Sequence, residues 1–281
     1  MNNKNYILNA DDFGLSQSIN RAIAEGYNNN ILNSTSLCAN GIAFDSAINE
    51  IMPECPNLCV GVHLNLIEGK ALCKHEQIPD LTDKNNNFNN GYIQLLLKSQ
   101  NKNFLEQIEI EFRAQIEKIL QHFQPFHIDS HVHTHSIPKI FEITCKLAKE
   151  YNIPFVRTQF ENPYITPILS KNLNMKYPVN LIKLCLLNTF TFINKKTVKQ
   201  YDLKTNDYLT GVTYTGMMSS DTVEYGLEVL KNKNDITVET LIHPYPETHK
   251  EEYEIMSNEN MKYKIENMGF KFTTYKELSR N

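Results

Sequence analysis

Short apolar runs alternate with amphipathic segments along most of this chain, and the alternation predicts its fold. Apolar runs that read as β-strands cover 6–10, 34–40, 57–66, 125–131, 154–159, 208–216 and 236–244, with a final strand and helix within 267–280. Helical spacing follows a cap at Ser16 and recurs at 44–52 before Pro53, at 103–122, from Pro138 and at 221–232. Seven or eight β/α alternations predict an α/β fold, a distorted (β/α) TIM-like barrel of parallel strands in a single domain over 1–281.

Two segments interrupt the alternation. Residues 67–100 are polar and rich in asparagine, which indicates an insertion. Residues 163–205 read as helical and are longer than an ordinary crossover, so we expect a helical cap. The most apolar part of this cap, 181–193, contains Lys183 and is too short to span a membrane, which favours a buried or lid helix.

Composition and charge exclude several classes of protein. The 281 residues are 41% hydrophobic, which is enough for a substantial core. A net charge of −4 with scattered lysines predicts no nucleic-acid surface. The six cysteines form no Cys-x-x-Cys pair, so we interpret them as structural or incidental thiols. The N-terminus lacks the apolar stretch of a signal peptide, so we expect a cytoplasmic protein.

Ionisable residues gather where the predicted strands end. They are Asp11 and Asp12 after the first strand, His63, His131, Arg157 and His243. Because the carboxyl ends of parallel barrel strands open onto one face, these groups should share a single mouth, and this pattern predicts an enzyme. Taken singly, each has a plainer interpretation. Asp-Asp can be a capping turn, His63 a buried core histidine and His243 a turn residue before proline.

The stretch "HIDSHVHTH", residues 127–135, holds four histidines and one aspartate. In a strand at about 3.3 Å per residue, His127 and His131 would lie roughly 13 Å apart. Two nitrogens on one zinc ion are only about 3–4 Å apart. We therefore expect the strand to end near Asp129, with His131 at the rim and His133 and His135 in the loop. A histidine-rich loop without a metal is the alternative.

An open site of two histidines and one aspartate would suit zinc, and also cobalt, manganese or iron. Such a metal lowers the pKa of a water molecule to near 7 in favourable cases, so a neighbouring carboxylate can deprotonate it. The predicted reaction class is hydrolysis of a polarised carbonyl or phosphoryl group. His243 in "LIHPYP" is then the candidate acid for the leaving group.

Six motifs together resemble one known family. In order they are "NADDFG" (9–14), "GVHLNL" (61–66), "HIDSHVHTHSIP" (127–138), "VR" (156–157) before the cap, "DYLTGVTYTGMM" (207–218) and "VETLIHPYP" (238–246). Over about residues 5–275 the chain resembles the YdjC-like carbohydrate deacetylases, the group that contains chitooligosaccharide deacetylase. The resemblance implies a distorted β/α barrel, one divalent metal ion and removal of N-linked acetyl groups from amino sugars.

The resemblance also implies roles for individual residues. By motif position the metal ligands would be Asp12, His63 and His131, the general base Asp11 and the general acid His243. Arg157 would orient Asp11 or the substrate, His133 and His135 would line the sugar site, His127 would be strand structure, and Asp129 would support a ligand. Zinc is the expected ion, with magnesium, cobalt or manganese as alternatives. Tyr245 stands where the family usually has glycine after "HP", which puts the local turn in question.

Two other classes of function remain open from the residues alone. A barrel phosphoesterase or amidohydrolase would also use a metal, but its His-x-His motif typically lies on the first strand, where this chain has Asp11 and Asp12. A non-catalytic sugar- or metal-binding barrel would be expected to lack the base or the acid. The expected partner is an N-acetylated sugar, whose identity the residues leave open, and the family suggests a homodimer.

Overall fold

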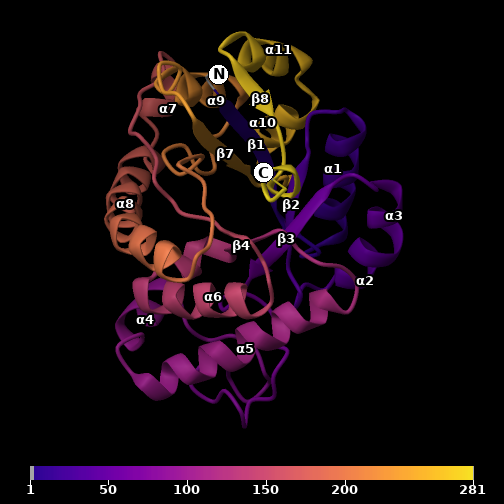
Figure 1. Ribbon diagram of the computed structural model, residues 1–281, viewed down its shortest axis with the longest axis vertical. Helices are drawn as coiled ribbons and strands as arrows, with labels where there is room; N and C mark the ends of the chain where they lie inside the picture. The colour runs from indigo at the N-terminus through magenta and orange to yellow at the C-terminus, as the bar shows by residue number, and fades with distance from the viewer. Residues whose placement is uncertain (1–2, 281) are drawn as a thin grey trace.

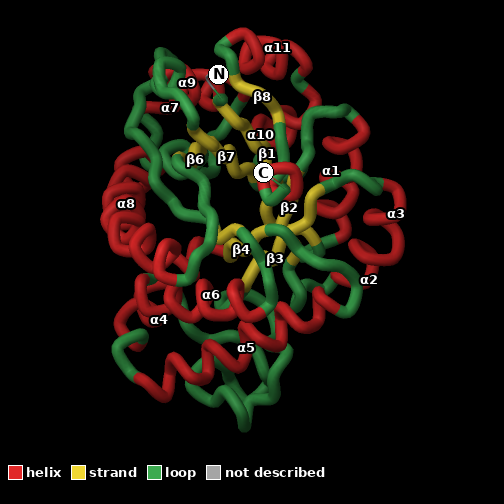
Figure 2. The backbone as a smooth tube through the Cα atoms, viewed as in Figure 1, coloured by secondary structure: helices red, strands yellow, loops and turns green. Residues whose placement is uncertain are grey.

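A curved sheet of parallel strands forms the centre of the computed structural model, which describes residues 3–280 (Figures 1 and 2). The strands are β1 (Lys4–Phe13), β2 (Ser34–Leu37), β3 (Cys59–Leu64), β4 (His127–Ser130), β5 (Phe155–Val156), β6 (Tyr208–Thr210), β7 (Ile236–Ile242) and β8 (Phe270–Phe272). Their order is β5-β4-β3-β2-β1-β7-β6, and β8 pairs with β1. The predicted distorted α/β barrel of seven or eight parallel strands is confirmed, and it has eight strands within residues 3–280.

The barrel is distorted at two places. Within residues 3–280 no ladder joins the end strands β5 and β6, and a single bridge from Phe155 to Lys204 lies near the opening. On the other side, β8 pairs with β1 at Lys4–Tyr6, whereas β2 pairs with β1 only from Asn9 onwards. Because β8 occupies the amino-terminal half of that edge, the sheet is splayed around β1.

Helices cover the outer face of the sheet (Figure 1). They are α1 (Gln17–Asn28), α2 (Phe44–Ser46), α3 (Met52–Glu54), α4 (Tyr92–Lys98), α5 (Lys102–Leu120), α6 (Pro138–Glu150), α7 (Leu169–Asn172), α8 (Lys176–Gln200), α9 (Ser220–Glu228), α10 (Lys250–Glu254), α11 (Glu259–Asn267) and α12 (Tyr275–Leu278). Ser16 caps α1 as expected, because its hydroxyl accepts the Ile19 amide hydrogen. The helix expected at 103–122 is α5, and its apolar stripe is buried against the sheet.

The helix expected to stop before Pro53 continues through it. After α2 the chain forms a π-helical turn at Ala47–Ile51, and Pro53 lies in the first turn of α3. Pro53 lies directly after the π-helical turn, where the Met52 amide bonds to the Ala47 carbonyl five residues earlier, so the regular i→i−4 pattern is already interrupted at this point. The expected stop was therefore two residues too early, because α3 ends at Glu54.

Several predicted strands are longer than the observed ones, and for two of them the structure shows why. The strand expected at 208–216 ends at Thr210 because Gly211 has φ +130° and the next amides, Val212 and Thr213, donate to the Glu161 carboxylate. The strand expected at 154–159 contains only β5. Beyond it, Thr158 exchanges hydrogen bonds with the side chain of Asn206 instead of with a neighbouring strand.

The two interrupting segments differ in structure. Residues 67–91 contain only isolated bridges before α4 begins. The helical cap expected at 163–205 is helical mainly in α7 and α8, and residues 163–168 are irregular. Helix α8 packs against α6. No helix among residues 3–280 is long and apolar enough to cross a membrane.

Candidate metal and catalytic site

A cavity of about 470 Å³ opens at the carboxyl ends of the strands, the face on which barrel enzymes place their active sites. Six of the predicted site residues line it: Asp11, Asp12, His63, His131, His133 and His243. Lys183 of the cap helix α8 and Tyr245 lie in the same wall. Arg157 is fully buried behind it. Most of the predicted site therefore comes together from five segments that are distant in sequence.

Asp11 and Asp12 are neighbours, yet both face the cavity. Successive side chains of a regular strand point to opposite faces of the sheet. Here the pairing of β1 with β2 shifts register between Ala10 and Phe13, and Asp12 has φ +71°. Such a β-bulge re-aims side chains, and aspartate adopts the left-handed conformation more readily than most residues. The bulge therefore brings two carboxylates into one site.

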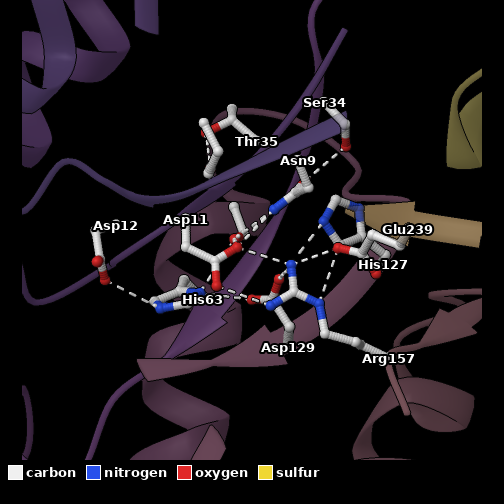
Figure 3. Close-up of polar contacts among 12 residues, drawn as sticks. Asn9, Asp11, Asp12, Ser34, Thr35, His63, His127, Asp129, Arg157 and Glu239 are labelled. Carbon is white, nitrogen blue, oxygen red and sulfur yellow. Dashed lines mark hydrogen bonds and ion pairs between the residues drawn. The ribbon is translucent and has the colours of Figure 1, made fainter. Parts of the chain in front are cut away.

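Arg157 binds Asp11 by both carboxylate oxygens (Figure 3). The two guanidinium nitrogens lie 2.8 Å and 2.7 Å from Oδ2 and Oδ1 of Asp11, and Asn9 donates to Oδ1 at 2.8 Å. Arg157 also donates from Nε to Glu239 at 2.9 Å, and one of its terminal nitrogens lies 2.6 Å from Asp129. Three buried carboxylates thus surround one guanidinium group. In this position Arg157 can orient the Asp11 carboxylate, but its own side chain does not line the cavity.

Asp12, His63 and His131 form a second group on the other side of Asp11. Oδ1 of Asp12 lies 2.7 Å from Nδ1 of His131 and 3.1 Å from Nε2 of His63. Burial by itself would raise the pKa of Asp12, but the two histidines hold it well below its usual range. Burial opposes protonation of His63, yet Asp129 and Asp12 raise its pKa to about 10. The neighbouring carboxylates thus favour the charged form of the His63 ring, whereas binding of a cation would require its neutral form.

The second nitrogen of His63 is fixed by a carboxylate. Nδ1 of His63 lies 2.6 Å from Oδ1 of Asp129 and 3.1 Å from the hydroxyl of Ser36. Histidines that bind metals usually have such a partner, which fixes the ring and directs the free nitrogen toward the ion. The expected role of Asp129 as a support for a ligand agrees with this contact.

The donor set can be tested against a divalent cation. Candidate ligand atoms of Asp12, His63 and His131 all lie within 4.8 Å of one another. Asp11, His63 and Asp129 meet the same distance criterion. In that second group Arg157 contacts both carboxylates, so its positive charge would repel a cation. Among the described residues, the first group is therefore the better fit, and its two nitrogens and one carboxylate oxygen suit zinc.

Strand β4 ends at Ser130, one residue beyond the expected position. The chain then enters a 3₁₀ turn at His131–Ser136, in which Val132 and His133 have φ +54° and +57°. This turn leaves His131 at the rim of the cavity, 13% exposed, as the spacing predicted. Within the stretch at 127–135, Asp129 and His131 thus belong to the group around His63. The other three histidines of the stretch lie outside this group.

The side chains of His133 and His135 lie in different parts of the structure. His133 lines the cavity, is 3% exposed, and its Nδ1 has no hydrogen-bond partner among the described residues. His135 was expected to line the sugar site too, but it is fully buried outside the cavity wall. Its ring bonds to the Ser130 hydroxyl and the Arg157 carbonyl oxygen and stacks on Phe141. The 3₁₀ turn separates the two side chains, so only His133 can touch a ligand here.

His127 lies at the floor of the barrel, as its assignment to strand structure implied. Its ring stacks on Tyr275 with 4.4 Å between centroids. A Cβ atom on Gly61 would lie only 2.4 Å from this ring. The glycine before His63 therefore permits close approach of His127, and burial lowers the pKa of His127 to about 4.

His243 faces the cavity at the end of β7. Its Nδ1 lies 3.0 Å from Oε1 of Glu252, and the same oxygen accepts the His243 amide hydrogen at 2.7 Å. Burial would lower the pKa of His243, but the hydrogen bond and charge of Glu252, with Asp12 and Asp11, raise it above its usual value. These contacts therefore favour the protonated form of the His243 ring in the cavity.

Tyr245, which sequence reasoning treated only as a departure from a family motif, lies in the site. Its hydroxyl donates to Oδ2 of Asp12 at 2.7 Å. Its amide donates to the His243 carbonyl at 2.8 Å, so the chain turns tightly after β7. Burial and the charge of Asp12 raise the pKa of Tyr245. The turn after the His-Pro motif therefore forms with tyrosine in place of the glycine that the family usually has there.

Other residues of the site also escaped sequence reasoning. Glu239, Glu252 and Glu68 contact site residues without belonging to a spacing that marks them. Of these three residues, Glu239 is the one that the sequence could best have indicated, because a glutamate in the middle of an apolar strand needs a buried partner. In the sequence, Lys183 favoured a buried or lid helix over a membrane span, but nothing placed this residue on the cavity. Burial lowers the pKa of Lys183 to about 8, against the charges of Glu161 and Asp11.

Comparison with known proteins gives a family and several relatives. A family model described as YdjC-like protein matches residues 5–267. A carbohydrate deacetylase of Clostridium beijerinckii is 43% identical over 149 residues, which is 53% of this chain and 58% of that protein. A chitooligosaccharide deacetylase of Escherichia fergusonii is 36% identical over 149 residues, 52% of this chain and 56% of that protein. Each alignment thus spans less than two thirds of the relative's length.

One solved structure matches along nearly the full length. A protein of Enterococcus faecalis V583, described as a cellobiose-phosphate cleavage protein, superposes with a TM-score of 0.76. The match covers 98% of this chain and 99% of that chain at 24% sequence identity. A likeness at this level of identity shows that the two proteins share the distorted barrel fold.

Proposed function

The chain belongs to the YdjC-like protein family, and on that premise we propose that it is a metal-dependent hydrolase that removes N-acetyl groups from amino sugars. Relatives named carbohydrate deacetylase and chitooligosaccharide deacetylase support this reaction. The observation that carries the proposal is the bulge at Asp11 and Asp12. The bulge directs the Asp12 carboxylate toward two histidines and the Asp11 carboxylate toward a buried arginine. Both aspartates lie in the cavity that His243 also lines.

Asp12, His63 and His131 would hold the divalent cation, and zinc suits their two nitrogens and one oxygen. When bound, such a cation supplies Lewis-acid polarisation of a carbonyl oxygen and lowers the pKa of water. The protein's contribution is to direct the donor atoms. Asp129 fixes His63 from behind, and the loop after β4 places His131 at the cavity rim.

Asp11 is the proposed general base. It is 2% exposed and borders the cavity, while Arg157 and Asn9 bind its oxygens from the side of the barrel interior. This two-point clamp fixes the plane of the carboxylate, so Asp11 presents the same oxygen edge to a water molecule in each catalytic cycle. The arginine acts through Asp11 and is a positioning residue.

His243 is the proposed general acid. The hydrogen bond to Glu252 orients its ring and raises its pKa, which keeps it protonated to higher pH. Asp11 takes a proton from the water molecule as the water oxygen attacks the carbonyl carbon of the acetyl group. The bond between that carbon and the amide nitrogen then breaks as His243 protonates the nitrogen. The products are acetate and a free amino sugar.

The cavity provides a place for the sugar. Its volume of about 470 Å³ lies within the range of small-molecule sites. His133, whose Nδ1 has no hydrogen-bond partner among residues 3–280, and Lys183 of α8 offer polar groups for sugar hydroxyls. Burial, with the charges of Lys183 and Arg157, lowers the pKa of His133, so we expect its ring to be neutral and able to accept or donate a hydrogen bond.

The proposal is tested by measuring acetate release from N-acetylated mono-, di- and trisaccharides with added zinc, magnesium, cobalt or manganese. We expect acetate from at least one of these sugars, and little from Asp11→Asn. Phosphate release from generic phosphoesters without acetate release would favour the phosphoesterase alternative. Sugar binding without any acetate release would favour the non-catalytic alternative.

A further inference from the structure

The two oxygens of the Asp12 carboxylate have different partners. Oδ1 faces the nitrogens of His131 and His63 at 2.7 Å and 3.1 Å. Oδ2 accepts a hydrogen bond from the Tyr245 hydroxyl at 2.7 Å. Asp12 is fully buried, and among residues 3–280 only Tyr245 donates a hydrogen bond to Oδ2. The tyrosine thus satisfies the one oxygen of Asp12 that does not face the histidines.

The phenol ring of Tyr245 is held in place by aromatic neighbours. It stacks on His243 with 6.3 Å between centroids and an angle of 23° between planes. His249 meets it edge-on at 5.4 Å. The tight turn from His243 fixes the backbone of Tyr245 at the same point. The hydroxyl therefore has few other positions, and its bond to Asp12 is preorganised.

We propose that Tyr245 is a positioning residue of the metal site, which reserves Oδ1 of Asp12 as the single carboxylate oxygen for the cation by occupying Oδ2. A carboxylate free to rotate can offer either oxygen or both, and it loses part of its free energy of binding in becoming ordered. Hydrogen-bond partners of metal ligands typically contribute 10–100-fold to metal affinity or activity. The inference rests on the metal binding in the proposed function.

The test measures zinc affinity directly. Protein stripped with a chelator is titrated with zinc in competition with a chromogenic chelator, and its thermal midpoint is measured without metal. We expect Tyr245→Phe, which keeps the ring and removes the hydroxyl, to weaken zinc binding by about 10–100-fold. Tyr253→Phe is the matched control, since Tyr253 also donates to a carboxylate, Glu25, but lies outside the cavity. It should leave zinc affinity unchanged.

A second variant separates the hydroxyl from the ring. Tyr245→Gly removes both, and we expect it to weaken zinc binding at least as much as Tyr245→Phe. If the folded Phe variant binds zinc with wild-type affinity, the inference is overturned, even if the KM of that variant for an acetylated sugar rises. Weak binding in the Gly variant alone would also overturn it, because the ring would then matter and the hydroxyl would not. A wild-type chain that bound no divalent ion would overturn the metal site of the proposed function, and the role of Tyr245 with it.

Discussion

Replacement of Arg157 by lysine tests the buried charge cluster behind the cavity. Arg157 makes four hydrogen bonds to Asp11 and Glu239 and a further ion pair with Asp129. Lysine keeps the charge, but it has three donors on one nitrogen and cannot form the fork. At least two charged hydrogen bonds are lost, at about 1.5–3 kcal/mol each, because the carboxylates remain buried. We expect the free energy of unfolding to fall by about 3–6 kcal/mol.

For a chain of 281 residues this loss corresponds to a thermal midpoint about 5–10 °C lower. The midpoint is measured by circular dichroism, with urea titration as a second measure. Arg113→Lys is the matched control, because Arg113 binds Glu150 with both partners partly exposed, and surface pairs contribute about 0–1 kcal/mol. A midpoint of Arg157→Lys within about 2 °C of the Arg113→Lys midpoint would show that the buried fork of Arg157 contributes no more than a surface ion pair.

Three further changes probe other parts of the site. Glu252→Gln should move the alkaline limb of the pH–rate profile to lower pH, because Glu252 raises the pKa of His243, the group that must stay protonated; an unmoved limb would exclude His243 as the acid. His133→Asn, which suits the left-handed backbone, should raise KM for an acetylated sugar about tenfold while zinc affinity stays constant, as shown by steady-state kinetics and zinc titration. Gly61→Ala should lower the thermal midpoint by about 2–5 °C, since the new Cβ would overlap the ring of His127; an unchanged midpoint would mean that the ring can move aside.

Strand ends were the most informative feature of the sequence. Parallel strands place their carboxyl ends on one face, so apolar runs that stop at Asp11, His63, His131 and His243 predicted residues that meet in one cavity. The spacing of the histidines also predicted the end of β4 to within one residue and separated His131 from the other histidines of its stretch. These inferences used only strand geometry, which is local and regular.

The rest depended on contacts that no local pattern encodes. The 3₁₀ turn after β4 sends His133 into the cavity and His135 away from it, although both lie in the same loop. The expected strand at 208–216 ends early because Glu161, distant in sequence, binds its backbone amides. The hydrogen bond from Tyr245 to Asp12 likewise needs the tertiary fold.

Asp11 and Asp12 have different proposed roles, Asp11 as general base and Asp12 as metal ligand, and a paired measurement distinguishes these roles. Zinc affinity and acetate release are measured for Asp11→Asn and Asp12→Asn beside the wild-type chain. Because Asp11 contacts Arg157 and Asp12 faces His63 and His131, we predict that Asp11→Asn keeps zinc binding but loses acetate release, whereas Asp12→Asn loses both. Equal loss of zinc in both variants, or full acetate release by Asp11→Asn, would contradict the account.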